Sequence, residues 1–285
     1  MQNPTATAAK YPPYFDVLLH HLRKDDPVTR VAFGRHVHWG YWTDPEGASG
    51  TAEDYADAAE TLCRHVCDAA EPRDGLRILD VGCGFGGTIA SLNERFSNLE
   101  LVGVNIDPRQ LERARAEVKP RNGNRITFVE ANACQLPFPD RSFDIVLAVE
   151  CIFHFPSRAD FFAHASRVLV PGGKLALSDF VPESRHLREL QQHDPGNDQA
   201  TKETYGKIDV LCTSEQYRAL AEENGLTMLP GRDITTHTLP TYPFLRHQHR
   251  SWPEAMARSF SRATTRLEAA SRMGWLYYMI LRFGK

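Results

Sequence analysis

The residues best suited to chemistry lie in a glycine-rich segment that follows a short apolar run. Residues 78–87 read Ile-Leu-Asp-Val-Gly-Cys-Gly-Phe-Gly-Gly, with Asp80 two positions before Gly82. Glycines permit a tight turn and a close approach of the backbone to a ligand. A helix that starts at Thr88 would point its free N–H groups at the same ligand. The pattern therefore predicts a small-molecule cofactor site between a strand and a helix.

The glycine spacing alone fits two classes of cofactor. Gly82, Gly84 and Gly87 satisfy the dinucleotide pattern G-x-G-x-x-G. Residues 80–86 also satisfy the tighter pattern D-x-G-x-G-x-G. The carboxylate of Asp80 favours the second pattern, because it can hold the amino group of a methionine moiety and would repel a pyrophosphate. The segment thus favours S-adenosylmethionine over a dinucleotide, and a nicotinamide-dependent dehydrogenase is disfavoured.

Strand and helix patterns alternate after this segment. Further strands are predicted at 99–107, 126–132, 145–149 and 174–179. Apolar residues at helical spacing predict helices at 110–118 and 158–169. This alternation is typical of an α/β fold in which helices cover both faces of a parallel sheet.

The chain resembles the class I S-adenosylmethionine-dependent methyltransferases over residues 70–240. The resemblance is carried by the loop at 80–87, the segment LPFPDRSFD at 136–144 and the turn LVPGG at 169–173. Two further segments, HWGYW at 38–42 and VECIFHF at 149–155, narrow it to the small-molecule branch. That branch includes sugar O-methyltransferases and tocopherol and sterol C-methyltransferases. The resemblance implies a Rossmann-like, seven-stranded, mostly parallel sheet whose last strand runs antiparallel.

The expected domain organisation has four parts. Residues 1–70 form a helical N-terminal cap, 71–240 the cofactor-binding core, 241–274 a lid insertion and 275–285 the last strand. Residues 182–212 are expected to contribute to the lid. Within the core, we expect a helix at 213–225 and a sixth strand at 226–238.

Most cofactor contacts follow from the resemblance, with two departures from the family pattern. Asn105 stands where an acidic residue usually accepts the ribose hydroxyls, and Asn132 where an aspartate usually contacts the adenine amino group. An amide oxygen can still accept a hydrogen bond. Tyr41 and Trp42 are expected to close over the cofactor, because aromatic faces attract a sulfonium cation. The expected cofactor contacts are Tyr41, Trp42, Asp80, Gly82, Cys83, Gly84, Asn105, Ile106, Gln110, Asn132, Ala133 and Glu150.

His154 is the best candidate for a general base. It follows the fourth strand at the carboxyl edge of the sheet, where ligands bind in open α/β folds. Its ordinary pKa of ~6.5 suits proton acceptance at neutral pH. Asp179 ends the next strand and could orient His154 or bind substrate, as a histidine and an aspartate do in the sugar O-methyltransferases that this chain resembles. Glu150 is a third candidate, either beside the cofactor or as the stabiliser of a carbocation.

The predicted function is transfer of a methyl group from S-adenosylmethionine to a hydroxyl of a small-molecule secondary metabolite, leaving S-adenosylhomocysteine. The alternative is a C-methyltransferase acting on a prenyl or aromatic carbon. A polar roof with a His154–Asp179 pair favours oxygen, whereas an aromatic roof around Glu150 favours carbon. A non-catalytic cofactor-binding protein, or a fold repurposed for cyclisation, stays open because fold does not fix function.

Composition limits the remaining partners. The net charge of −3 and the pI near 6.5 show no electrostatic footprint for nucleic acid. No apolar run approaches the ~20 residues that a membrane span needs, so we expect a cytoplasmic protein, with a homodimer possible. The six cysteines are expected to be reduced. His36 and His38 form an H-x-H pair, but without an acidic or cysteine partner nearby in sequence we expect no metal.

Overall fold

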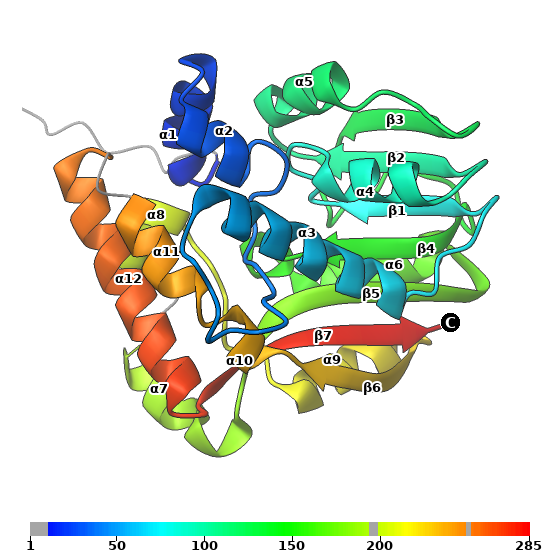
Figure 1. Ribbon diagram of the computed structural model, residues 1–285. Helices are drawn as coiled ribbons and strands as arrows, with labels where there is room; N and C mark the ends of the chain where they lie inside the picture. The colour runs from blue at the N-terminus through cyan, green and yellow to red at the C-terminus, as the bar shows by residue number, and fades with distance from the viewer. Residues whose placement is uncertain (1–10, 194–198, 249–251) are drawn as a thin grey trace, which may run out of the picture.

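The computed structural model describes residues 11–193, 199–248 and 252–285. At its centre lies a seven-stranded sheet of order β3-β2-β1-β4-β5-β7-β6 (Figure 1). Strand β7 runs antiparallel to both neighbours, and the other paired strands run parallel. This confirms the expected Rossmann-like sheet. The strands are β1 Arg77–Val81, β2 Glu100–Asn105, β3 Arg125–Glu130, β4 Phe143–Val149, β5 Leu169–Pro182, β6 Thr227–Asp233 and β7 Leu276–Gly284.

The central strands are mostly apolar on both of their faces because both faces of the sheet are covered. Successive side chains of a strand point to opposite faces. Ile78 and Ile145 accordingly pack into one core, whereas Leu79 and Val146 pack into a second core. One face carries α3 Ala52–Ala69, α4 Gly87–Arg95 and α5 Pro108–Glu117, and the other α6 Arg158–Val168 and α9 Ser214–Glu223.

Helix α3 belongs to the sheet and not to a separate cap. It contacts β4, β5 and β7, and its residues Tyr55, Leu62 and Val66 are buried in the core of that face. Thr51 begins the helix by accepting a hydrogen bond from the backbone N–H of Asp54 at 3.2 Å. The boundary expected at residue 70 is therefore too late, and the N-terminal cap ends before α3.

A group of helices gathers beyond the carboxyl ends of the parallel strands (Figure 1). Helix α12 packs beside α8 and α11 there. Both segments expected to form a lid, 182–212 and 241–274, contribute helices to this group. The remaining helices and short helical turns of the described residues are α1 Tyr14–Arg23, α2 Pro27–Phe33, η1 Ile152–His154, η2 Ser184–His186, α7 Leu187–His193, α8 Gln199–Tyr205, α10 Thr235–Thr238, α11 Thr241–Gln248 and α12 Glu254–Arg272.

The sixth strand is shorter than the sequence pattern predicts. It ends at Asp233, whose Oδ1 accepts a hydrogen bond from the backbone N–H of Thr235 at 2.9 Å. Such a side-chain contact to the nearby backbone competes with strand pairing and turns the chain into α10. Among the described residues, no helix combines the length and apolar character that a bilayer span requires.

Candidate active site

The glycine-rich loop makes the tight turn that its sequence predicts. Gly82, Gly84 and Gly86 have positive φ angles of 73°, 53° and 84° between β1 and α4. A Cβ atom on Gly82 would lie 2.7 Å from both Cβ and Sγ of Cys151. The loop therefore packs against the segment after β4 with no room for a side chain at this position.

A cavity of ≈ 380 Å³ lies over this loop at the carboxyl ends of the strands. That size is within the range of small-molecule sites, roughly 300–1,000 Å³. Most of the cofactor contacts expected from the sequence line it. The expected residues that line this cofactor cavity are Gly82, Cys83, Gly84, Asn105, Ile106, Gln110, Asn132, Ala133 and Glu150.

Both asparagines that depart from the family pattern use their amide oxygens locally. Asn105 Oδ1 accepts from the backbone N–H of Ile106 at 2.7 Å, and its Nδ2 donates to Gln110 Oε1 at 3.1 Å. Asn132 Oδ1 accepts from the backbone N–H of Cys134 at 2.9 Å. The side chain of Ile106 is 46% exposed and lines the cavity, which suits packing against a flat base.

Asp80 lies behind the loop and does not line the cavity. Its carboxyl group is buried, and burial raises its pKa well above the ordinary value. Oδ2 has no hydrogen-bond partner among the described residues. A buried carboxyl oxygen without a donor is costly. This arrangement does not bring the carboxyl group of Asp80 to the cavity, so its expected contact with the amino group of S-adenosylmethionine stays a prediction.

The aromatic residues expected to close over the cofactor lie elsewhere. Tyr41 stacks on His237 with ring centroids 4.4 Å apart, and Trp42 Nε1 donates to Asp54 at 3.0 Å. Both side chains are buried and neither lines the cavity. The expectation for Tyr41 and Trp42 is therefore wrong, because their rings pack against α3 and α10. The preceding part of the same loop, at 35–38, lines the cavity instead.

A second, smaller cavity of ≈ 60 Å³ adjoins the first. Aromatic and aliphatic side chains from the helical group and the strand ends form most of its wall. Two of the three candidate catalytic residues, Glu150 and His154, line both cavities. The apolar wall of this second cavity comprises Leu18, Phe33, Trp39, Tyr55, Phe153, Phe180, Ile208, Leu245, Trp252, Phe260 and Leu267.

Glu150 joins the loop at 35–42 to the sheet. Its Oε2 accepts from the backbone N–H of Trp39 at 2.8 Å and from the hydroxyl of Tyr278 on β7. Burial raises the pKa of Glu150 to about 8. The residue has a φ of 48°, a left-handed conformation that costs a non-glycine residue about 1–3 kcal/mol and is typical of functional sites.

His154 faces both cavities with an uncharged ring. Burial lowers its pKa to about 4, so the imidazole is neutral at pH 7 and is a weaker base than an exposed histidine. Its ring stacks on Tyr14 with centroids 6.4 Å apart and packs beside Phe153. The structure thus places His154 where the sequence predicts a general base, at the carboxyl edge of the sheet.

Asp179 does not pair with His154. It is fully buried, accepts a hydrogen bond from Arg158 Nη2 at 2.8 Å and another from the hydroxyl of Tyr217, and lines neither cavity. Successive residues of β5 point to opposite faces, and Phe180, the next residue, faces the apolar cavity. The predicted His154–Asp179 pair is therefore wrong, and Asp179 belongs to a buried ion pair.

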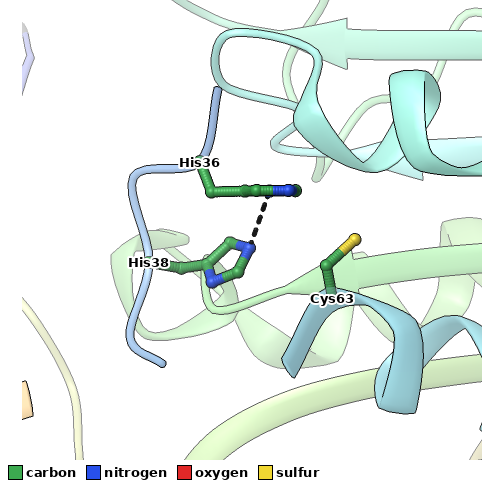
Figure 2. Close-up of side chains that lie close together, drawn as sticks. All are labelled: His36, His38 and Cys63. Carbon is green, nitrogen blue, oxygen red and sulfur yellow. Dashed lines mark hydrogen bonds between the residues drawn. The ribbon is translucent and has the colours of Figure 1, made fainter. Parts of the chain in front are cut away.

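The H-x-H pair has partners that sequence spacing does not reveal. Figure 2 shows His36, His38 and Cys63 facing one another, with Cys63 contributed by α3. Glu60, one turn earlier on α3, lies 2.8 Å from Nε2 of His36. Acidic and cysteine partners that are absent from the neighbouring sequence thus lie beside these histidines in the fold.

A family model described as a methyltransferase domain matches residues 79–177. Methyltransferase GfsG from Streptomyces halstedii is 34% identical, over 76% of this chain and 74% of that protein. The 27-O-demethylrifamycin SV methyltransferase from Amycolatopsis mediterranei is 32% identical, over 74% of this chain and 73% of that protein. The fold is shared with geranyl diphosphate C-methyltransferase from Streptomyces coelicolor, whose structure contains Mg²⁺, geranyl diphosphate and S-adenosylhomocysteine. The two structures match with a TM-score of 0.68 and 18% sequence identity, over 97% of this chain and 99% of that chain.

Proposed function

The chain belongs to the class I S-adenosylmethionine-dependent methyltransferases of the small-molecule branch, and we propose that it methylates a hydroxyl of a hydrophobic secondary metabolite. The relative from Amycolatopsis mediterranei, named as a methyltransferase of 27-O-demethylrifamycin SV, supports this acceptor class. The apolar wall of the smaller cavity supports a hydrophobic acceptor. The six free, buried cysteines support a reducing, cytoplasmic location.

The residues of the larger cavity fit S-adenosylmethionine. The glycine loop lets the protein backbone approach this cofactor closely, and the exposed side chain of Ile106 suits the adenine face. When bound, this cofactor supplies a methyl group already activated by a positive sulfur. The protein's own task is then to position the acceptor about 3–3.5 Å from that methyl carbon and to exclude water.

His154 carries the proposal because its side chain lines both the larger and the smaller cavity. An acceptor hydroxyl must lose its proton as the new oxygen–carbon bond forms. A neutral imidazole nitrogen at the junction of the two cavities can take that proton. A base so positioned contributes about 10²–10⁴-fold to the rate. Glu150 positions the roof by holding the backbone of Trp39.

One observation favours the second candidate, methylation of carbon. Trp39, Phe153 and Phe180 line the smaller cavity beside Glu150, so the roof is aromatic and contains no His154–Asp179 pair. Aromatic faces stabilise cations, and Glu150 would add to that effect on a prenyl acceptor only above its pKa of about 8, where it is a carboxylate.

Transfer of an isotope-labelled methyl group separates these candidates. The purified chain is incubated with labelled S-adenosylmethionine and a source extract, and products are fragmented by mass spectrometry. Label on oxygen supports the proposal, and label on carbon supports the second candidate. Intact binding of S-adenosylhomocysteine without any labelled product would overturn methyl transfer and favour a repurposed fold.

A further inference from the structure

The cluster of His36, His38 and Cys63 lies at the edge of the cofactor cavity and has no part in the mechanism above. All three side chains are buried, and one ligand atom from each lies within 4.8 Å of the others (Figure 2). His36 Nδ1 and His38 Nε2 are 3.1 Å apart. Two nitrogens that share a tetrahedral zinc ion, at about 2.0–2.1 Å each, lie about 3.3–3.4 Å apart. The two histidines are thus already spaced for a shared ion.

The outer nitrogens of both rings face acceptors. His38 Nδ1 lies 2.8 Å from the carbonyl oxygen of Trp39, and His36 Nε2 lies 2.8 Å from a carboxylate oxygen of Glu60. A carbonyl or a carboxylate can only accept, so each outer nitrogen carries a hydrogen. In two neutral rings, the inner nitrogens then present lone pairs to each other. That contact is repulsive unless a proton or a cation lies between them.

The same arrangement is typical of metal-ligating histidines, whose second ring nitrogen donates to a carboxylate or a carbonyl. That hydrogen bond fixes the ring and leaves the inner nitrogen free to bind the ion.

The sulfur of Cys63 supplies the third ligand atom. It comes from α3, whereas both histidines come from the loop that precedes this helix. A single thiol proton could satisfy only one of the two inner nitrogens. A divalent cation would be held by both nitrogens and by the thiolate together, which matches the affinity of zinc for imidazole and thiolate ligands.

We propose that His36 Nδ1, His38 Nε2 and Cys63 Sγ form a binding site for one Zn²⁺ ion, with Glu60 and the carbonyl of Trp39 orienting the histidines. On binding, two imidazole lone pairs and the thiolate bond the ion, and the thiol proton of Cys63 leaves to solvent. The site joins the loop at 35–38, which lines the cofactor cavity, to α3. It also abuts the glycine loop, since a Cβ atom on Gly87 would lie 2.4 Å from His36 Nδ1. The ion would therefore hold the loop at 35–38, which forms one wall of the cofactor cavity, against α3.

Zinc content tests the site without substrate or cofactor. The untagged chain is stripped with a chelator, equilibrated with Zn²⁺, desalted and measured by elemental mass spectrometry. We expect one zinc per chain, lost in Cys63→Ser and retained in Cys212→Ser, because Cys212 is also buried and free but lies outside the cluster. Glu60→Gln should weaken zinc affinity by about 10–100-fold, the usual effect of losing an orienting partner.

Cobalt substitution tests the ligand set in the unaltered chain, so that misfolding of a variant cannot decide the outcome. Co²⁺ bound to Cys63 should produce a near-ultraviolet thiolate-to-metal absorption band and release one proton per ion. A chain that binds no stoichiometric zinc would overturn the proposal. So would a cobalt complex without the thiolate band, or equal zinc loss in the Cys63 and Cys212 variants.

Discussion

Replacement of His154 tests the proposed proton transfer most directly, because this imidazole lies where the two cavities meet. His154→Ala removes the proton acceptor and leaves the glycine loop and Glu150 in place. A general base contributes about 10²–10⁴-fold to the rate. At about 1.36 kcal/mol per factor of ten, this equals roughly 2.7–5.4 kcal/mol of the activation barrier. We expect kcat to fall by at least about 100-fold, with affinity for S-adenosylhomocysteine retained.

The pH dependence of the native chain adds a second, independent readout. The pKa of His154 is lowered from 6.5 to about 4, so the acid limb of kcat/KM should lie near pH 4. Between those values the unfolded chain binds more protons than the folded chain, and stability therefore rises with pH across this window. The rise is about 3 kcal/mol, at about 1.36 kcal/mol for each pKa unit. His154→Ala should abolish this part of the stability profile.

Single-turnover transfer of a labelled methyl group, followed by mass spectrometry, measures the chemical step. His164→Ala is the matched control, because His164 lies on α6 and lines neither cavity. Native turnover in His154→Ala would refute the assignment of the base. An acid limb near pH 6.5 in the native chain would refute the buried, neutral state of His154.

Three further substitutions have expected outcomes. The pKa of Glu150 is about 8 in the folded chain and 4.5 in the unfolded chain, so the folded chain binds more protons between these values and its stability falls as pH rises from 4.5 to 8. This fall is up to about 5 kcal/mol in the free energy of unfolding. Glu150→Gln should remove it, which thermal melts from pH 5 to pH 9 would show. Asp179→Asn should lower the free energy of unfolding, measured in urea, by about 3–5 kcal/mol, because the buried charge of Arg158 is left under-compensated. Unchanged stability would show that the pair is not structural. Gly82→Ala combines an unfavourable φ of 73° with a clash against Cys151, and calorimetry should show S-adenosylhomocysteine binding weakened at least tenfold, about 1.4 kcal/mol. Native affinity in Gly82→Ala would mean that the loop can relax away from Cys151.

The fold and much of the cofactor cavity could be predicted because their determinants are local. The turn at Gly82, the apolar strand ending at Val81 and the exposed Ile106 each lie within a few residues of the features that reveal them. Parallel strands then bring their carboxyl ends to one edge of the sheet. The residues that follow β2, β3 and β4 meet there for that reason.

The roles that failed depend on partners distant in the sequence. Asp179 pairs with Arg158 and Tyr217, and no pattern near Asp179 indicates them. The rings of Tyr41 and Trp42 pack against α3 and α10, a choice made by tertiary packing and not by the aromatic motif. Cys63 reaches the histidines only because α3 lies along the sheet instead of in a separate cap.

Strand β7 is the last strand in the sequence but lies between β5 and β6 in the sheet, so the sheet cannot be completed before the end of synthesis. Among the strands of the described residues, β6 pairs only with β7, and β5 needs β7 to cover its second edge. Until residues 276–284 are available, a nascent or truncated chain presents β5 as a bare edge, which is prone to join other strands. Tyr278, which hydrogen-bonds Glu150, arrives on the same strand. A chain whose translation stops before β7 is therefore expected to aggregate through the exposed edge of β5 and to lack part of its active site.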